Sequence, residues 1–170
     1  MLGLGKLPVY QDEQFRYLTE KLNGYITGAY IYNKMGLTEQ VATTITIATP
    51  NPVRRFRFKN LDIECVKAYC MVYPDESLVP YLRLLDAIKD MKRIPGTTGQ
   101  DIYNRVKSQY FNGYSLLELE KIVSLAKSYP PRVRKVVADI LGDIRQTVLQ
   151  TEMAKTILPT TRFNLDYKTA

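Results

Sequence analysis

Histidine is absent from this chain of 170 residues, which also has no tryptophan and only two cysteines. Without histidine, Ser-His-Asp and Cys-His nucleophile systems, histidine-containing zinc sites, haem with a histidine ligand and imidazole general bases are all excluded. Two thiols, Cys65 and Cys70, cannot complete a structural zinc site by themselves. We therefore expect both to be reduced thiols in or near a core, and we expect no catalytic residue, no cofactor and no metal.

Long hydrophobic runs are also lacking. Charged residues or tyrosines interrupt every apolar stretch well before the ~18 residues that a membrane span needs. The first ten residues, Met1 to Tyr10, lack the basic-then-apolar layout of a signal peptide. The chain is thus expected to be cytoplasmic, with no membrane partner.

The composition, 45% hydrophobic and 24% charged, is that of one ordinary globular domain. The segment 1–10 is short, glycine-bearing and non-periodic, so we expect an arm or the remnant of a linker. Residues 11–158 are expected to form the single domain. The polar segment 159–170 is expected to be a loosely packed tail.

Hydrophobic periodicity indicates an α+β fold with two N-terminal helices, a small three-stranded sheet that includes a β-hairpin, and a helical C-terminal half. The helices are predicted near 12–22 and 25–35, where Gly36 follows the second one. Strands are predicted at 43–49, 54–59 and 61–69, where side chains alternate and β-branched residues are frequent.

From Ser77 onward the hydrophobic period changes from two to 3.6 residues, which predicts helices only. Ser115 and Glu118 have the spacing of a capping box, in which each side chain satisfies an end-of-helix amide of the other. A long final helix is expected from 132 to about 151, with core positions at Val133, Val136, Val137, Ile140, Ile144 and Val148.

Positive charge is concentrated in one place. Lys and Arg number 24 against 17 Asp and Glu, and the segment 53–59 supplies four units of the net charge of +7. This favours an acidic partner, nucleic acid before a small anion. Strand alternation places Phe56 and Phe58 on one face and Arg55, Arg57 and Lys59 on the other. The candidate nucleic-acid or partner-binding residues of this segment are Arg54, Arg55, Arg57 and Lys59. The alternative is a solvated edge strand that charge protects from aggregation.

A second basic cluster, Arg132, Arg134 and Lys135, opens the predicted final helix. Helix N-termini attract anions, so this cluster is a second candidate contact. The alternative is three solvated side chains.

Two aspartate pairs, Asp86 with Asp90 and Asp139 with Asp143, have i,i+4 spacing on predicted helices. Such pairs could bind a metal or perform acid-base chemistry, which keeps a metal-dependent enzyme acting on nucleic acid or nucleotides as an alternative. Tyrosine is abundant, with 13 residues, and is typical either of interfaces or of half-buried positions between helices and sheet.

The segment 24–41, followed by the strand 44–48 and an arginine-rich strand, resembles the AbiEi-like antitoxin and transcriptional regulator family, in particular an uncharacterised branch with the wording G-Y-x-T-G…N-x-x-G-L-T-x-Q-V. The stretches 84–95 and 125–134 fit the same branch, so the resemblance extends over about residues 5–150. The motif falls on Gly24, Tyr25, Thr27, Gly28, Asn33, Gly36, Leu37, Thr38, Gln40 and Val41.

The resemblance implies an antitoxin domain of a bacterial toxin–antitoxin or phage-defence system, which opposes a nucleotidyltransferase-type toxin. In this family the domain normally follows a DNA-binding winged helix-turn-helix that supports transcriptional autoregulation, and the chain is expected to begin where that winged domain would end. None of the motif residues is catalytic in the family. The alternatives left open are a protein interaction module without nucleic-acid binding, and a structural role for the motif, with the side chains of Asn33, Thr38 and Gln40 satisfying backbone groups in the turn before the strand.

Overall fold

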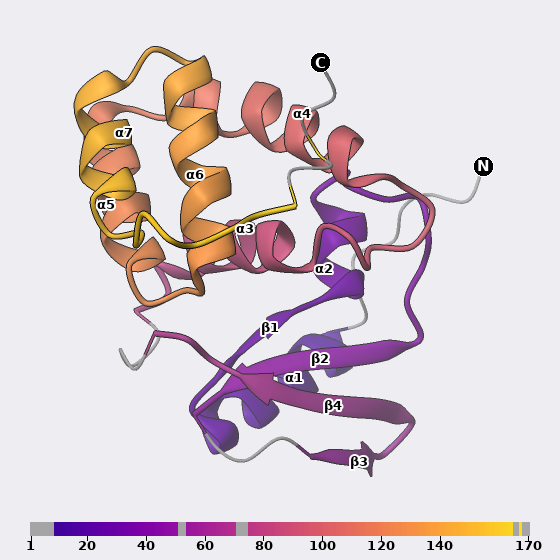
Figure 1. Cartoon of the computed structure of the whole chain (residues 1–170). Helices are drawn as coiled ribbons and strands as arrows, with labels where there is room; N and C mark the ends of the chain where they lie inside the picture. The colour runs from indigo at the N-terminus through magenta and orange to yellow at the C-terminus, as the bar shows by residue number, and fades with distance from the viewer. Residues whose placement is uncertain (1–8, 51–53, 71–74, 165–166, 168–170) are drawn as a thin grey trace.

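A computed structural model describes residues 9–50, 54–70, 75–164 and 167, and it consists of a sheet half and a helical half (Figure 1). The sheet half ends with Lys67, and the first helix of the helical half begins at Val79. The fold is α+β, as the periodicity predicts. Of the arm expected at 1–10, residues 1–8 lie outside the described residues, while Val9 already begins the first helix.

The strands form one mixed sheet in the order β1-β2-β4-β3. The two central strands, β2 and β4, are parallel, and each edge strand pairs antiparallel with its neighbour. Phe58 pairs with Leu61 across a two-residue connection, which confirms the predicted hairpin. The strands are β1 (Tyr25–Thr27), β2 (Thr44–Thr49), β3 (Arg55–Phe58) and β4 (Leu61–Lys67).

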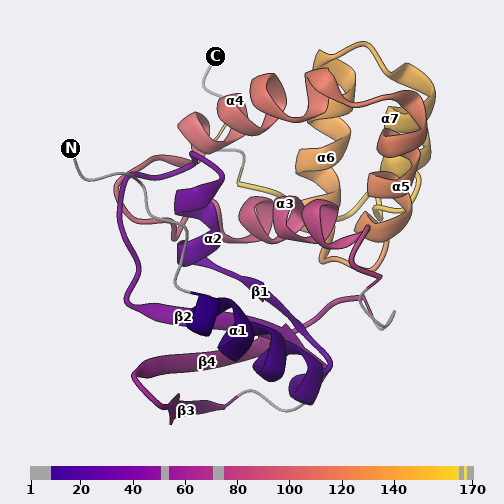
Figure 2. The ribbon, with the colours of Figure 1, turned by 180° about the vertical axis from the view of Figure 1, so that it is seen from behind.

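The two faces of the sheet differ in polarity. Helix α1 (Val9–Leu22) lies over one face, as Figure 2 shows from its side, and the side chains of Ile47 and Cys65 are fully buried there. The opposite face carries Thr44, Thr46 and the acidic residues of β4, all partly or fully exposed. The alternation of the strands therefore produces one apolar and one polar face.

The region predicted as a helix at 25–35 is instead a strand followed by a short helix. Residues Tyr25–Thr27 pair with β2, which gives the sheet four strands where three were predicted. Gly28 then turns the chain with φ 79°, and helix α2 (Ala29–Lys34) has only six residues. A three-residue strand is too short to show a period of two, so hydrophobic spacing alone favoured the helix.

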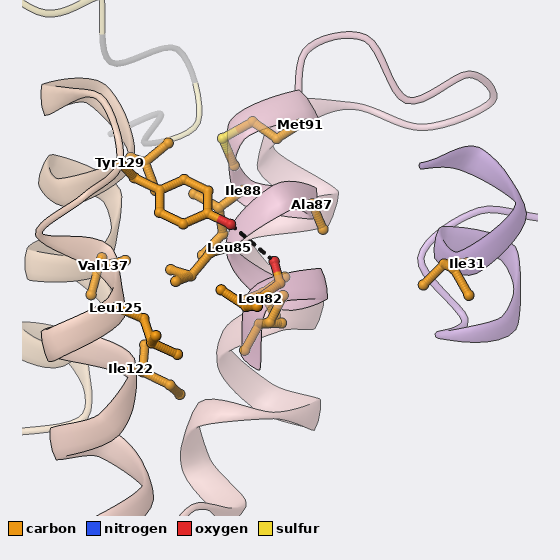
Figure 3. Packing of buried hydrophobic residues seen from close by; sticks show 14 of the residues in the cluster. Ile31, Leu82, Leu85, Ala87, Ile88, Met91, Ile122, Leu125, Tyr129 and Val137 are labelled. Atoms are coloured by element: carbon orange, nitrogen blue, oxygen red, sulfur yellow. Dashed lines mark hydrogen bonds between the residues drawn. The ribbon is translucent and has the colours of Figure 1, made fainter. Parts of the chain in front are cut away.

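The helical half is built around α3 (Val79–Asp90). In Figure 3, Leu82, Leu85 and Ile88 of α3 turn toward Ile122 and Tyr129, and the Tyr129 hydroxyl oxygen lies 3.4 Å from the Leu82 carbonyl oxygen. Each fully buried leucine or isoleucine contributes about 1.5–3 kcal/mol through burial of apolar surface. Helices α4 (Gly99–Gln109), η1 (Phe111–Gly113) and α5 (Leu116–Ala126) also contribute buried residues to this core.

The predicted capping box opens α5. The Glu118 amide donates to Ser115 Oγ at 3.2 Å, and the Ser115 amide donates to Glu118 Oε2 at 2.8 Å. The core positions that the sequence indicates in this helix, among them Leu119 and Ile122, are buried. The prediction of this helix and of its start is therefore confirmed.

The single long helix predicted from 132 to 151 is wrong. The structure has α6 (Pro131–Asp143) and α7 (Thr147–Ala154), because Arg145 adopts φ 63° and ends the first helix. The break changes the helical phase, so Leu149 is buried while Val148, predicted as a core residue, is 79% exposed. A left-handed arginine has no signature in sequence that a periodicity argument can detect.

The structure also describes the two cysteines and part of the C-terminal tail. Cys65 and Cys70 are both free, with Cys65 fully buried and Cys70 partly so. In the tail predicted to pack loosely, Tyr167 is nonetheless buried and stacks on Tyr103 with ring centroids 5.1 Å apart. Over the described ranges, no helix combines the length and the apolar character that a membrane crossing requires.

Candidate functional site

The basic strand, which we define as Arg54 to Lys59, forms the outer edge of the sheet (Figure 1). The side chains of Arg55 and Arg57 are 81% and 72% exposed, on the polar face of the sheet. Arg54 and Lys59 are also exposed, but Lys59 lies in the hairpin turn with φ 53°, so it does not continue the alternation of the strand. The structure thus brings the four predicted cationic residues to one edge.

Acidic residues of β4 lie directly across from the arginines. The register pairs Arg55 with Glu64 and Arg57 with Asp62. Arg55 donates to Glu64 Oε1 from Nη2 at 2.7 Å and from Nε at 3.1 Å, whereas the Arg57 to Asp62 distance is 3.9 Å. These exposed pairs contribute little to stability. They do reduce the positive charge of this edge. Its net charge remains positive, because the cations of the basic strand outnumber the carboxylates that face them from β4.

The other face of the basic strand is aromatic. Phe58 stacks on Tyr17 of α1 with centroids 5.6 Å apart and an interplanar angle of 19°. Lys59 lies over the Phe58 ring at 5.7 Å and Lys21 over the Tyr17 ring at 5.6 Å. Tyr17 is 50% exposed. Phe58 is partly buried, so the more exposed Tyr17 ring and the cations beside it are the part of this surface on which a nucleobase can stack.

The second basic cluster is engaged within the protein. Arg134 donates from Nε to the Tyr129 carbonyl at 3.1 Å and from Nη1 to the Thr156 carbonyl, and Lys135 donates to Asp139 at 3.0 Å. Arg132 is half buried in the first turn of α6. Figure 1 places α6 in the helical half and β3 at the far edge of the sheet. The structure therefore does not bring the two predicted basic clusters together.

The four helical aspartates each accept a hydrogen bond from tyrosine. Tyr32 donates to Asp90 at 2.7 Å, and Tyr103 donates to Asp143 at 2.6 Å. Tyr167 donates to Asp139 at 2.8 Å. Asp86 accepts from two tyrosines. In the part of the chain that the structure describes, no three cysteine, aspartate or glutamate side chains are grouped as metal ligands would be.

Asp86 is the most deeply buried of these carboxylates, with 2% of its surface exposed. Tyr25 donates to its Oδ2 at 2.7 Å, Thr27 to the same oxygen at 2.8 Å, and Tyr129 to Oδ1 at 2.8 Å. Burial raises the pKa of Asp86, while the charge of Lys89 and the three donated hydrogen bonds oppose this shift. In turn, burial and the Asp86 charge raise the pKa of Tyr129 and Tyr25, which keeps both as hydroxyl donors.

The motif residues lie mainly between the two halves of the molecule. Besides Tyr25 and Thr27, Thr38 reaches the helical half, where its Oγ1 donates to the Pro95 carbonyl at 2.6 Å. Asn33 donates to the Thr38 carbonyl at 3.2 Å, and Leu37 is fully buried. Gln40 lies beside Gly96, while Val41 is 80% exposed. Gly24, Gly28 and Gly36 occupy the turns between the elements.

Sequence reasoning missed the pairing of tyrosines with aspartates. The signals were present as an excess of tyrosine and two i,i+4 aspartate pairs, but nothing in the sequence connects one set with the other. It also missed the acids that face the basic strand. We compared the chain with protein-family models, curated proteins and solved structures, and found no match in any of the three.

Proposed function

We propose that this chain is a non-enzymatic binding module of the bacterial cytoplasm, of the antitoxin type that its segment 24–41 resembles, and that it contacts nucleic acid through the basic strand. In this proposal it opposes a nucleotidyltransferase-type toxin. The observation that carries the proposal is the edge position of β3, with Arg55 and Arg57 exposed on one face and the Tyr17–Phe58 stack on the other.

Two kinds of contact follow from this arrangement. Arginines on alternate strand positions lie about 6.6 Å apart, a spacing that suits successive phosphates of a single strand. The rings of Tyr17 and Phe58, with Lys21 and Lys59 over them, offer a surface for an unpaired base. Binding of phosphate would exchange the exposed Arg55–Glu64 pair for a charge-assisted contact of similar geometry.

A second candidate is an acidic partner protein, the toxin itself. The specific observation in its favour is that β3 has a paired neighbour on only one side, so its outer backbone groups face away from the sheet. An acidic strand could pair with this edge, and the basic side chains would select for it.

The test uses the wild-type chain and a variant in which Arg55, Arg57 and Lys59 are all replaced by glutamine. Glutamate is unsuitable because it would face Glu64 and Asp62 across the register and destabilise the hairpin. The matched control replaces Lys121, Lys155 and Arg162, which are exposed in the helical half, by glutamine and so removes the same charge. Equal melting temperatures of all three proteins establish that the fold is kept.

Binding is measured by fluorescence anisotropy with labelled single-stranded RNA, single-stranded DNA and a DNA duplex, each at two salt concentrations. We expect single strands to bind the wild type and the control equally, and the basic-strand variant at least about tenfold more weakly, with a salt slope smaller by about 2 because each lost phosphate contact removes about 0.7. Equal binding by the two variants would overturn the assignment to β3.

The same proteins are then co-expressed with a nucleotidyltransferase-type toxin encoded beside the gene, and growth is followed. Rescue by the wild type and the control, but not by the basic-strand variant, supports the antitoxin assignment. Rescue together with absence of nucleic-acid binding, and co-purification of the toxin, favours the acidic protein partner. Folded protein that neither binds nucleic acid nor rescues growth refutes both candidates.

A further inference from the structure

A cavity of about 610 Å³ lies on the opposite edge of the sheet from the basic strand. Its walls come from α1, from the turn after α1, from β1 and from the start of α3. The volume lies within the range of small-ligand sites. Phe15, Val79 and Pro80 supply apolar wall, and Arg16 and Arg83 supply positive charge.

Arg83 is the central polar group of this cavity. It is half buried on α3, and its Nε donates to the Ile26 carbonyl of β1 at 2.8 Å. That bond holds the plane of the guanidinium against the strand edge. Within the described ranges, no acceptor is hydrogen-bonded to Nη1 or Nη2 of Arg83. The charge is costly to keep there, because burial lowers the pKa of Arg83, although nearby Asp86 opposes the shift.

The backbone of β1 supplies a second donor. In an antiparallel pair, the N–H and C=O of one residue point toward the same side. The Ile26 carbonyl accepts its hydrogen bond from Arg83 and therefore points away from β2. The Ile26 N–H points the same way, toward the cavity that lies along this edge. A guanidinium group beside an outward-pointing backbone amide can donate hydrogen bonds to both oxygens of a carboxylate.

We propose that this cavity binds a monocarboxylate with an apolar body, its carboxylate held by Arg83 and the Ile26 amide and its apolar part against Phe15, Val79 and Pro80. Glu20 and Glu76 also line the cavity, so a second negative charge on the ligand would be repelled. The carboxylate can belong to a free small acid or to the C-terminus of a peptide. This site is separate from the basic strand, and its test does not depend on the proposed function.

The experiment titrates the ¹⁵N-labelled full chain with hexanoate and with acetyl-Val-Leu, whose free C-terminus represents a peptide end. Hexanamide and hexylamine are the matched controls, since they keep the apolar body and change the charge. Ligands are added up to about 10 mM, where a millimolar ligand nears saturation of its site. Saturable shifts of the Ile26 amide with hexanoate, and binding of hexanamide at least about tenfold weaker, are expected.

Three variants locate the site. Arg83→Gln removes the guanidinium group and is expected to weaken carboxylate binding at least about tenfold, and Arg83→Lys to weaken it less. Because Arg83 also holds β1, Thr19→Phe is added, which reduces the cavity from α1 and leaves residue 83 and its bond to Ile26 unaltered in sequence. If acetyl-Val-Leu binds more strongly than hexanoate, the site is assigned to peptide C-termini. If hexanoate binds more strongly, the site is assigned to free small acids.

The inference fails if hexanamide binds as tightly as hexanoate, if hexylamine is preferred, or if no amide near Ile26 shifts. It fails equally if a folded Thr19→Phe variant binds hexanoate as the wild type does, since the cavity would then not be the place of binding.

Discussion

Replacement of Tyr129 by phenylalanine tests whether the buried carboxylate of Asp86 depends on its hydroxyl donors. Tyr129 donates to Asp86 Oδ1 at 2.8 Å, and both residues are buried. A hydrogen bond to a charged group contributes about 1.5–3 kcal/mol, and the phenyl ring preserves the packing. We therefore expect Tyr129→Phe to reduce the free energy of unfolding by about 2 kcal/mol and the melting temperature by about 4–8 °C.

The matched control is Tyr32→Phe. Tyr32 donates to Asp90 at a similar distance, 2.7 Å, but the Asp90 side chain is 23% exposed and also accepts from Arg93. Water and the arginine can take the place of the lost hydroxyl there, so the cost is expected to be about 1 kcal/mol or less. Urea unfolding at constant pH measures both. A Tyr129→Phe variant as stable as the wild type, or a larger loss in Tyr32→Phe, would refute the reasoning.

The pH dependence gives an independent check with a definite sign. Burial raises the pKa of Asp86 in the folded state, so between the unfolded and folded pKa values the folded state holds more protons. The Asp86 contribution to stability is therefore fully present below the unfolded pKa and falls as the pH rises through the folded pKa. Loss of a Tyr129 hydrogen bond raises that pKa further and widens the window.

Exposed carboxylates with lowered pKa, such as Asp75 and Glu118, change stability in the opposite direction. The readout is thus the difference between wild type and Asp86→Asn at each pH. We expect the stability of the wild type relative to Asp86→Asn to decrease from acid toward neutral pH. A difference that is flat or rises with pH would show that Asp86 is not a destabilised carboxylate.

Two further predictions concern the fold. Leu149→Asp should destabilise the protein severely, by about 4 kcal/mol or more, whereas Val148→Asp should change stability by no more than about 0.5 kcal/mol, because only Leu149 is buried. Equal thermal melts of the two variants would contradict this assignment, and a larger loss in Val148→Asp would favour the single long helix. Gly28→Ala should cost about 1–3 kcal/mol in chemical unfolding, since φ is 79° and the new Cβ would lie 2.6 Å from Thr46 Oγ1 and 2.7 Å from Thr46 Cβ. A Thr46→Gly background removes both atoms and should recover the steric part only, whereas Thr46→Ala keeps the Cβ and should recover little.

How far the fold follows from sequence depends on whether an element is long enough to show its period. The capping box of Ser115 and the apolar stripe after it identify α5 without tertiary information. Strand β1 pairs over three residues and is specified by β2, which lies about twenty residues further along the chain. The parallel pairing of β2 with β4 is likewise non-local, and periodicity carries no information about it.

The positions of the acidic residues that face the basic strand could have been predicted from the sequence. Once a two-residue connection joins the hairpin strands, Phe58 must pair with Leu61, and counting outward places Arg57 opposite Asp62 and Arg55 opposite Glu64. The tyrosine donors of Asp86 were not within reach, because Tyr25 and Tyr129 come from segments more than one hundred residues apart. Only the packing of β1 and the α5–α6 connection against α3 brings them together.

A buried carboxylate is a poor source of stability, since an apolar side chain of similar volume avoids its desolvation. It is, however, selective about geometry, because three donors must reach it at once. Tyr25 and Thr27 do so from β1, while Tyr32 and Thr38 bond Asp90 and the Pro95 carbonyl. Apolar contacts alone are compatible with several positions of the sheet half on α3, whereas these hydrogen bonds can all be made in only one position. We infer that the motif at 24–41 defines the junction between the halves, whereas the basic strand lies outside this motif.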